Sequence, residues 1–157
     1  MRTASRKPPD LDLSALRATF GFTVRMAQLR LYERFHRQLW RRHHLHPGAF
    51  AALAAIGGNP GVSPGRLADA LTVKRPNMTK LLDALARGGW IERRHQAGDG
   101  RGVALHLTGR GERRIARVMR EVRAVDRAST AMLSRRERAV ALALLDKIAS
   151  GLERPLS

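Results

Sequence analysis

The sequence contains no cysteine, and this absence excludes several kinds of chemistry. Without thiols the chain forms no disulfide, no thiolate metal site and no thiol-based oxidation sensor. Aromatic residues make up only 4% of the 157 residues, which disfavours sheet-rich folds and surfaces on which bases stack. No apolar run approaches the roughly 18 residues that cross a bilayer, so we expect no membrane-spanning segment.

Negative charge is scarce in this sequence. Only 13 residues are Asp or Glu against 30 Lys or Arg, which gives a formal net charge of +17. This balance favours a polyanionic partner, either nucleic acid or an anionic membrane surface. The start of the chain lacks the apolar segment of a signal peptide. We therefore interpret residues 1–11 as a flexible basic tail and expect a cytoplasmic protein.

Residues 61–111 carry the pattern of a winged helix-turn-helix. Ser63 can cap a short first helix that runs to about Leu71. Thr72 and Val73 make the turn, and a second helix is predicted over about residues 75–87. Pro76 is compatible with the first turn of that helix, where the backbone N–H has no helical partner. Glycines 88–89 end the helix, because glycine adopts the left-handed conformation without steric cost.

The second helix of this pattern has an apolar and a polar face. The apolar residues follow the three- and four-residue spacing of a core stripe: Met78, Leu81, Leu82 and Leu85. The first turns offer short polar and basic side chains on the other face, which suits the major groove of DNA. The candidate DNA-contacting residues in and around this helix are Ser63, Lys74, Arg75, Pro76, Asn77, Thr79 and Lys80.

Two short strands are predicted after this helix, over residues 90–94 and 103–107, with a glycine-rich tip between them. Arg101 in the tip can reach a narrow minor groove, where the negative potential is deepest, while Asp99 holds the tip by an ion pair. The alternative interpretation of the tip is a solvated turn. Arg94, at the end of the first strand, is a further candidate DNA contact.

This wing and its exit resemble the MarR family of bacterial transcriptional regulators. The similarity rests on Asp99-Gly100-Arg101, the family's D-x-R wing, followed by Leu107-Thr108-Gly109-Arg110-Gly111, its L-T-x-x-G exit. Residues 81–91 are similar to the end of the family's recognition helix, and a looser match covers about residues 13–152. The resemblance implies a transcriptional regulator that binds double-stranded DNA. If two recognition helices are related by a two-fold axis, they read a pseudo-palindromic operator.

The regions on either side of the winged unit predict a homodimer. A long helix over about residues 12–42 carries two apolar stripes. A helix from Thr108 to about Met132 has a narrow apolar seam, formed by Ile115, Val118, Val122, Val125 and Met132. Ser134 and Glu137 form the capping box of a last helix. These faces exceed what one subunit needs, so we infer a dimer built from both chain ends.

The fold class expected from this pattern is mainly α with a small β wing. An apolar content of 43% is enough for a core. The expected boundaries are 1–11 for the tail, 12–46 for an N-terminal dimerisation helix, 47–111 for the DNA-binding domain and 112–157 for C-terminal dimerisation helices.

The resemblance also implies a small-molecule effector, because the family commonly senses small aromatic acids and phenolics, and some members sense their coenzyme A thioesters. Arg25, Tyr32 and His36 lie on the first helix at positions where family pockets form. An arginine with a phenol and an imidazole suits an anionic aromatic compound. The alternative is that Tyr32 and His36 are only interface residues.

These observations favour a ligand-responsive, sequence-specific repressor, with a sequence-neutral architectural DNA-binding protein as the alternative. High positive charge supports the alternative, whereas Asn77 and Thr79 suit base edges and oppose it. Paired carboxylates, a nucleophile elbow and a phosphate loop are missing, so we predict no enzyme and no cofactor. Histidines 43, 44 and 46 have no carboxylate or cysteine at ligand spacing, so we predict no metal site. Two apolar stripes on the first helix fit a protein interface better than a membrane surface.

Overall fold

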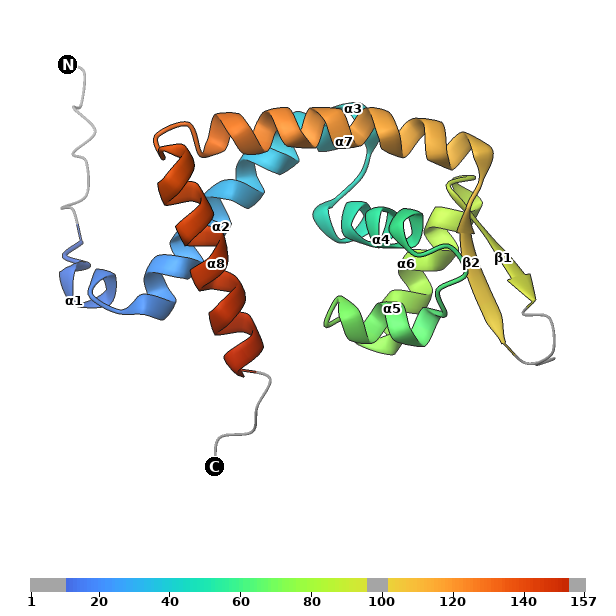
Figure 1. Cartoon of the computed structure of the whole chain (residues 1–157), viewed down its shortest axis with the longest axis horizontal. Helices are drawn as coiled ribbons and strands as arrows, with labels where there is room; N and C mark the ends of the chain where they lie inside the picture. The colour runs from blue at the N-terminus through green and yellow to red at the C-terminus, as the bar shows by residue number, and fades with distance from the viewer. Residues whose placement is uncertain (1–10, 96–101, 153–157) are drawn as a thin grey trace, which may run out of the picture. The chain divides into compact units, whose positions relative to one another are not determined.

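A computed structural model describes residues 11–95 and 102–152 of the chain. It is mostly helical with a two-stranded antiparallel sheet, which confirms the expected fold class (Figure 1). The chain divides into two units, residues 1–33 and 34–157. The elements are α1 (Ser14–Arg17), α2 (Phe20–Phe35), the π-helical turn η1 (His36–Trp40), α3 (Arg41–His43), α4 (Pro47–Gly58), α5 (Pro64–Ala70), α6 (Arg75–Arg87), β1 (Ile91–His95), β2 (Val103–Leu107), α7 (Gly109–Ser129) and α8 (Arg135–Leu152).

The N-terminal helix is interrupted, whereas the sequence predicted one continuous helix over about residues 12–42. Helix α1 ends at Arg17 and α2 begins at Phe20. Between them the Thr19 hydroxyl donates to the carbonyl of Leu16 at 2.8 Å. Such side-chain bonds compete with the helical backbone ladder, which explains the break. No residue of α1 or α2 is buried, and their exposed large apolar side chains include Leu16, Phe20, Leu29 and Leu31.

The core of the second unit is formed by α4, α5, α6, the sheet and the first half of α7. Its largest fully buried side chains are Leu53, Ile56, Leu67, Met78, Leu82, Leu105 and Val118. Three polar side chains cap the N-termini of helices that enclose this core. His46 Nδ1 accepts from the Ala49 N–H at 3.2 Å to cap α4, and the Ser63 hydroxyl accepts from the Arg66 N–H at 3.3 Å to cap α5. The Thr108 hydroxyl caps α7.

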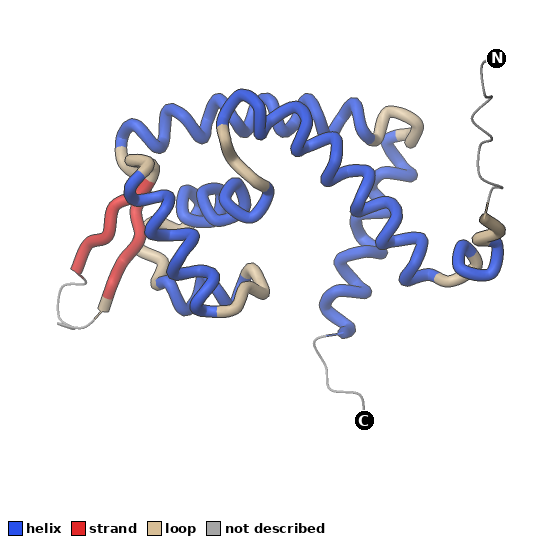
Figure 2. Tube along the Cα trace, turned by 180° about the vertical axis from the view of Figure 1, so that it is seen from behind, coloured by secondary structure: helices blue, strands red, loops and turns tan. Residues whose placement is uncertain are grey.

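The sheet pairs Ile91 with Leu107 at its base and His95 with Val103 at its outer end, so the predicted strands are correct to within one residue. A third segment adds to it. The N–H of Gly61 donates to the carbonyl of Leu105 at 2.8 Å, and the N–H of Leu105 donates to Val62 at 3.0 Å. Figure 2 shows the two strands in red beside the helices of the winged unit. The linker between α4 and α5 is therefore fastened to β2.

The apolar face of α7, which was predicted to form a dimer seam, is partly buried within the chain. Ile115 and Val118 belong to the core of the winged unit, so these two seam residues are covered within the chain. Met132 lies beyond the end of α7 and is 75% exposed. The periodicity identified the apolar face of α7 correctly, but the elements that pack against α7 are α4, η1 and β2.

Helix α8 begins at the predicted capping box. The Ser134 N–H donates to the Glu137 carboxylate at 2.7 Å, and the Glu137 N–H donates to the Ser134 hydroxyl at 3.2 Å. No residue of α8 is buried. Its exposed large apolar side chains are Val140, Leu142, Leu144, Leu145 and Leu152. No helix in the part of the chain that the structure describes is long and apolar enough to cross a membrane.

Candidate nucleic-acid interface

The first turns of α6 form an exposed polar surface above a buried apolar face. Met78 is 1% exposed and faces the core together with Leu82 and Leu85. Every predicted DNA-contacting residue of this segment is exposed: Lys74, Arg75, Pro76, Asn77, Thr79 and Lys80. The structure therefore brings these six side chains together at one end of one helix.

Three of the candidates already have polar partners within the chain. The Thr79 hydroxyl donates to the carbonyl of Arg75 at 3.1 Å, so in this conformation it can accept a hydrogen bond from a base but not donate one. The Ser63 hydroxyl accepts from the Arg66 N–H and is half-buried, but its own hydrogen can still be donated. Arg75 lies 3.9 Å from the Asp69 carboxylate in an exposed pair that contributes little stability.

A tight turn joins α5 to α6 and sets the direction of the second helix. Thr72 has a φ of +52°, which is uncommon outside glycine. The conformation is held because the Val73 N–H donates to the Ala68 carbonyl at 2.9 Å and the Thr72 N–H donates to Asp69 at 3.1 Å. The turn was predicted at Thr72 and Val73, and the structure confirms it.

The C-terminal end of α6 closes in a hydrogen-bonded glycine turn. Gly89 has a φ of +65°, as predicted for the left-handed position. The Trp90 N–H donates to the carbonyl of Leu85 at 3.0 Å, and the Gly89 N–H donates to Ala86 at 2.9 Å. This is the Schellman pattern, which satisfies the last carbonyls of a helix. It turns the chain directly into β1.

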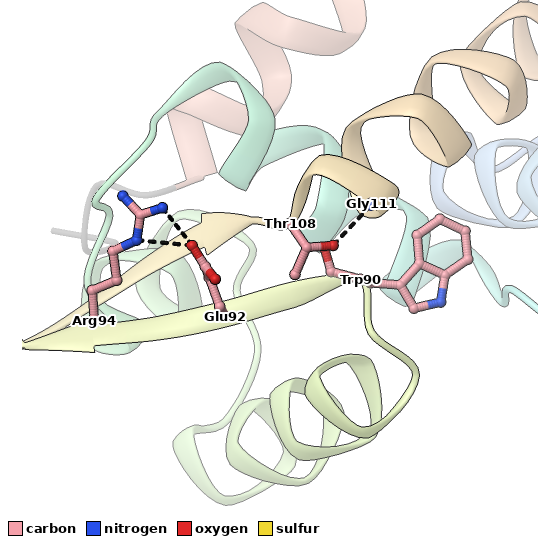
Figure 3. Close-up of polar contacts among 5 residues, drawn as sticks. All are labelled: Trp90, Glu92, Arg94, Thr108 and Gly111. Carbon is pink, nitrogen blue, oxygen red and sulfur yellow. Dashed lines mark hydrogen bonds and ion pairs between the residues drawn. The ribbon is translucent and has the colours of Figure 1, made fainter.

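Thr108 fastens the wing to the helices on both sides (Figure 3). Its hydroxyl donates to the carbonyl of Gly89 at 2.7 Å and accepts from the Gly111 N–H at 2.9 Å. Its own N–H donates to the carbonyl of Trp90 at 3.0 Å. A Cβ on Gly111 would lie 2.0 Å from that same Trp90 oxygen, so the position requires glycine. The L-T-x-x-G segment thus has a structural explanation.

Trp90 also packs at the junction between the end of α6 and the start of α7. Trp90 is 5% exposed, and the Arg114 guanidinium carbon lies 3.6 Å from the centroid of its ring. The same guanidinium donates to the carbonyl of Gly88 at 3.2 Å. Burial, and then the charge of Arg110, lower the pKa of Arg114 from its ordinary value. Sequence patterns did not identify this contact, because its partners are far apart in the chain.

The arginines of β1 are both paired with carboxylates. Arg94 Nε donates to the Glu92 carboxylate at 2.8 Å, as Figure 3 shows, so part of its charge is neutralised before any contact with DNA. Arg93, which the sequence did not single out, donates to the Asp83 carboxylate of α6 at 2.6 Å. The predicted wing-tip residues Asp99 and Arg101 lie outside the described residues.

The three effector candidates are exposed, and none of them lines the cavity beside the sheet of the winged unit. Arg25 and Tyr32 lie on α2, and Tyr32 is 50% exposed. His36 stacks on Trp40 with ring centroids 5.6 Å apart. The cavity, of about 510 Å³, lies between α4, the sheet and α7, and its lining includes Ile56, Leu107 and Met119.

The three histidines at positions 43, 44 and 46 have defined contacts. His43 Nε2 lies 3.0 Å from the Glu121 carboxylate of α7, and His46 caps α4. His44 has a φ of +52° and lies edge-on to Trp40. Within residues 11–95 and 102–152, no group of three histidine or carboxylate side chains is arranged to hold a metal ion.

Comparisons with known proteins agree with this geometry. A MarR family model matches residues 44–102. A transcriptional regulatory protein of the hcr operon from Thauera aromatica is 31% identical over 94% of this chain and 92% of its own. The repressor CouR, bound to a 23-mer DNA duplex, is 31% identical with a TM-score of 0.83, covering 89% of this chain and 99% of its own. The Mycobacterium tuberculosis MarR family protein Rv2887, in complex with salicylic acid, is 25% identical with a TM-score of 0.67, covering 83% and 96%.

Proposed function

This chain belongs to the MarR family of DNA-binding transcriptional regulators, and we propose that it acts as a sequence-specific, ligand-responsive repressor in homodimeric form. The observation that carries the proposal is the exposed N-terminal face of α6, held by a buried Met78 and a closed turn at each end. Its polar and basic side chains supply both base-edge and phosphate contacts. A sequence-neutral DNA-binding protein has no need of such a face.

Asn77 is the residue best suited to read a base. Its amide can form two hydrogen bonds with adenine in the major groove. We expect Asn77→Ala to cost about 1–3 kcal/mol at one base position of each half-site. Operators are first selected from a random duplex library, and binding is then measured over every single-base variant at fixed salt.

Two variants serve as controls in that series. Asn59→Ala removes the same amide from the end of α4, where it donates to the Ala55 carbonyl, and should not change base preference. Lys80→Ala should weaken binding by a similar factor on every sequence, as loss of a phosphate contact does. If Asn77→Ala gives the uniform pattern of Lys80→Ala, then Asn77 does not read a base.

The homodimer is supported by the apolar face of α8. Leu144 is 54% exposed and lies on the same stripe as Val140 and Ile148, whereas Leu142 points to the opposite side of the helix. We expect Leu144→Asp to convert the dimer to a folded monomer, while Leu142→Asp leaves the dimer intact. Light scattering with circular dichroism measures both. Equal masses for the two variants would oppose this interface.

The effector is a small aromatic carboxylate or its coenzyme A thioester, and Arg25 contacts its negative charge. Support comes from the exposed Arg25 and Tyr32, two turns apart on α2, and from the complex of the related Rv2887 with salicylic acid. DNA and effector must weaken each other's binding by the same factor if the two sites are coupled. Calorimetric titration of salicylate against the dimer, with and without operator, measures this factor.

The effector experiment has its own control. Arg25→Ala should reduce the release of operator by salicylate without changing binding of the ligand-free protein to DNA. Arg30→Ala, on a different face of α2, should leave the release unchanged. Absence of binding by salicylate and by a coenzyme A thioester below millimolar concentration would remove the effector from the proposal.

A further inference from the structure

Helix α7 has a buried face and a strongly basic opposite face. Its buried residues are Gly111, Ile115, Val118 and Val125. The exposed face carries arginines at three- and four-residue spacing, which places them within a narrow arc of the helix. We call them the α7 arginine stripe: Arg110, Arg113, Arg117, Arg120 and Arg127, all of them exposed. Among these positions only Ala124 interrupts the spacing.

The carboxylates of α7 are directed elsewhere. Glu121 contacts His43 and Arg42, and Asp126 pairs with Arg138 of α8. Glu112 lines the cavity beside the sheet. Among the residues that the structure describes, no ion pair joins a stripe arginine to a carboxylate. A solvated helix face usually mixes charges of both signs, so like charges along the whole stripe repel one another until an anion binds.

The stripe faces away from the recognition surface. Its helix packs on α4 through Ile115 and Val118, and the stripe lies opposite those residues. Figures 1 and 2 show α4 between α7 and α5, and α6 begins beside α5, while its last turn reaches α7, where Arg114 donates to the Gly88 carbonyl. A duplex read by α6 therefore lies on the far side of the winged unit from the stripe.

We propose that the α7 arginine stripe binds the phosphate backbone of a second DNA duplex, so that the protein bridges two duplexes. The stripe covers 17 residue steps, roughly 25 Å of helix. Its first four arginines follow one another at about 5 Å, and Arg127 lies about 10 Å beyond Arg120. Phosphates of one strand follow at roughly 3.4 Å along the axis. Long guanidinium side chains can each reach a separate phosphate over this length. The contact is independent of base sequence, because it involves the backbone alone.

A capture experiment tests the bridge. Biotinylated operator duplex on beads is saturated with protein, washed, and offered a fluorescent duplex without operator at near-physiological salt. We expect wild-type protein to capture the second duplex and the double variant Arg113→Gln/Arg117→Gln to capture at least fivefold less. The logarithmic salt slope of capture should fall by about 1.8 for two lost phosphate contacts. Operator binding should not change.

The matched control removes equal charge from another helix. Arg135→Gln/Arg136→Gln alters two exposed arginines at the start of α8 and should capture as well as wild type. Glutamine retains helix propensity, so both pairs should fold, which circular dichroism verifies.

Three outcomes would overturn the proposal: no capture by wild type, equal capture by both double variants, or displacement of the second duplex by single-stranded RNA more effectively than by duplex DNA. If the second duplex is held by a further recognition helix instead, Asn77→Ala will abolish its capture and the α7 change will not. If the operator experiments show no base preference but the second duplex is still captured, the proposed sequence-specific function fails and the bridging proposal stands.

Discussion

Replacing Gly111 by alanine should lower the melting temperature of the protein by roughly 10 °C. The added Cβ would lie 2.0 Å from the Trp90 carbonyl oxygen and 2.9 Å from its carbonyl carbon, well inside the 3.4 Å at which ordinary contact begins. Both neighbours are backbone atoms, so no side chain can rotate away. The end of α6 and the start of α7 must therefore separate.

The magnitude follows from what that separation breaks. Overpacking of a core costs about 1–3 kcal/mol. The bonds from the Thr108 N–H to Trp90 and from the Gly111 N–H to the Thr108 hydroxyl are strained as well, at about 1 kcal/mol each. Alanine returns about 1 kcal/mol of helix propensity. The net loss is about 3 kcal/mol, and for a chain of this size each kcal/mol lowers the melting temperature by roughly 2–4 °C.

Differential scanning calorimetry at one protein concentration measures the change, because the proposed dimer would make the melting temperature depend on concentration. Gly58→Ala, at the end of α4, is the matched control: a Cβ there meets nothing within 4 Å. It should be neutral or slightly stabilising. Equal melting temperatures for the two variants would refute the steric explanation of the L-T-x-x-G segment.

Three further changes test contacts of the winged unit and of α8. Arg114→Met should remove about 0.5–2 kcal/mol of interaction with Trp90 and shift the fluorescence of Trp90. Arg113→Met, which changes the exposed neighbouring residue, should change neither the stability nor the fluorescence by this amount. Asp83→Asn should cost under about 1 kcal/mol, because its pair with Arg93 is 40% exposed on both sides, and a larger loss by urea unfolding would show a greater role. Hydrogen bonds from the Ser134 hydroxyl and then from its N–H lower the pKa of Glu137. The contribution of this capping box to folding stability is therefore present at neutral pH and is lost as the pH falls through the lowered pKa. NMR titration of Ser134→Ala should show a higher pKa for Glu137 than in the wild type.

The elements that the sequence predicted well are those with local signals. Helix α6 has the predicted bounds because Pro76 fits its first turn and Gly89 closes its last one. The capping box of α8 and the strands of the wing follow from equally short patterns. The break at Thr19 depends on hydroxyl bonds that no apolar periodicity reveals.

The parts of the site that the sequence missed depend on distant partners. Exposure of Asn77 and Lys80 follows from helical periodicity alone. The Arg93–Asp83 pair and the contact of Arg114 with Trp90 require knowledge of which elements meet. Periodicity likewise gave an apolar face to α7 without saying that α4 would cover Ile115. The sequence of one helix shows which of its faces is apolar, but not which element packs against that face.

The fastening of the α4–α5 linker to β2 has a consequence for the behaviour of the wing in a crowded cell. Val62 lies along one side of β2 and β1 along the other, so backbone groups of β2 are paired on both sides near Leu105. The remaining edge belongs to β1, whose sequence I-E-R-R-H places three charged side chains in succession. Charged edge strands resist pairing with the edges of other molecules. A wing built to approach DNA is thereby also protected from joining its sheet to that of a neighbour.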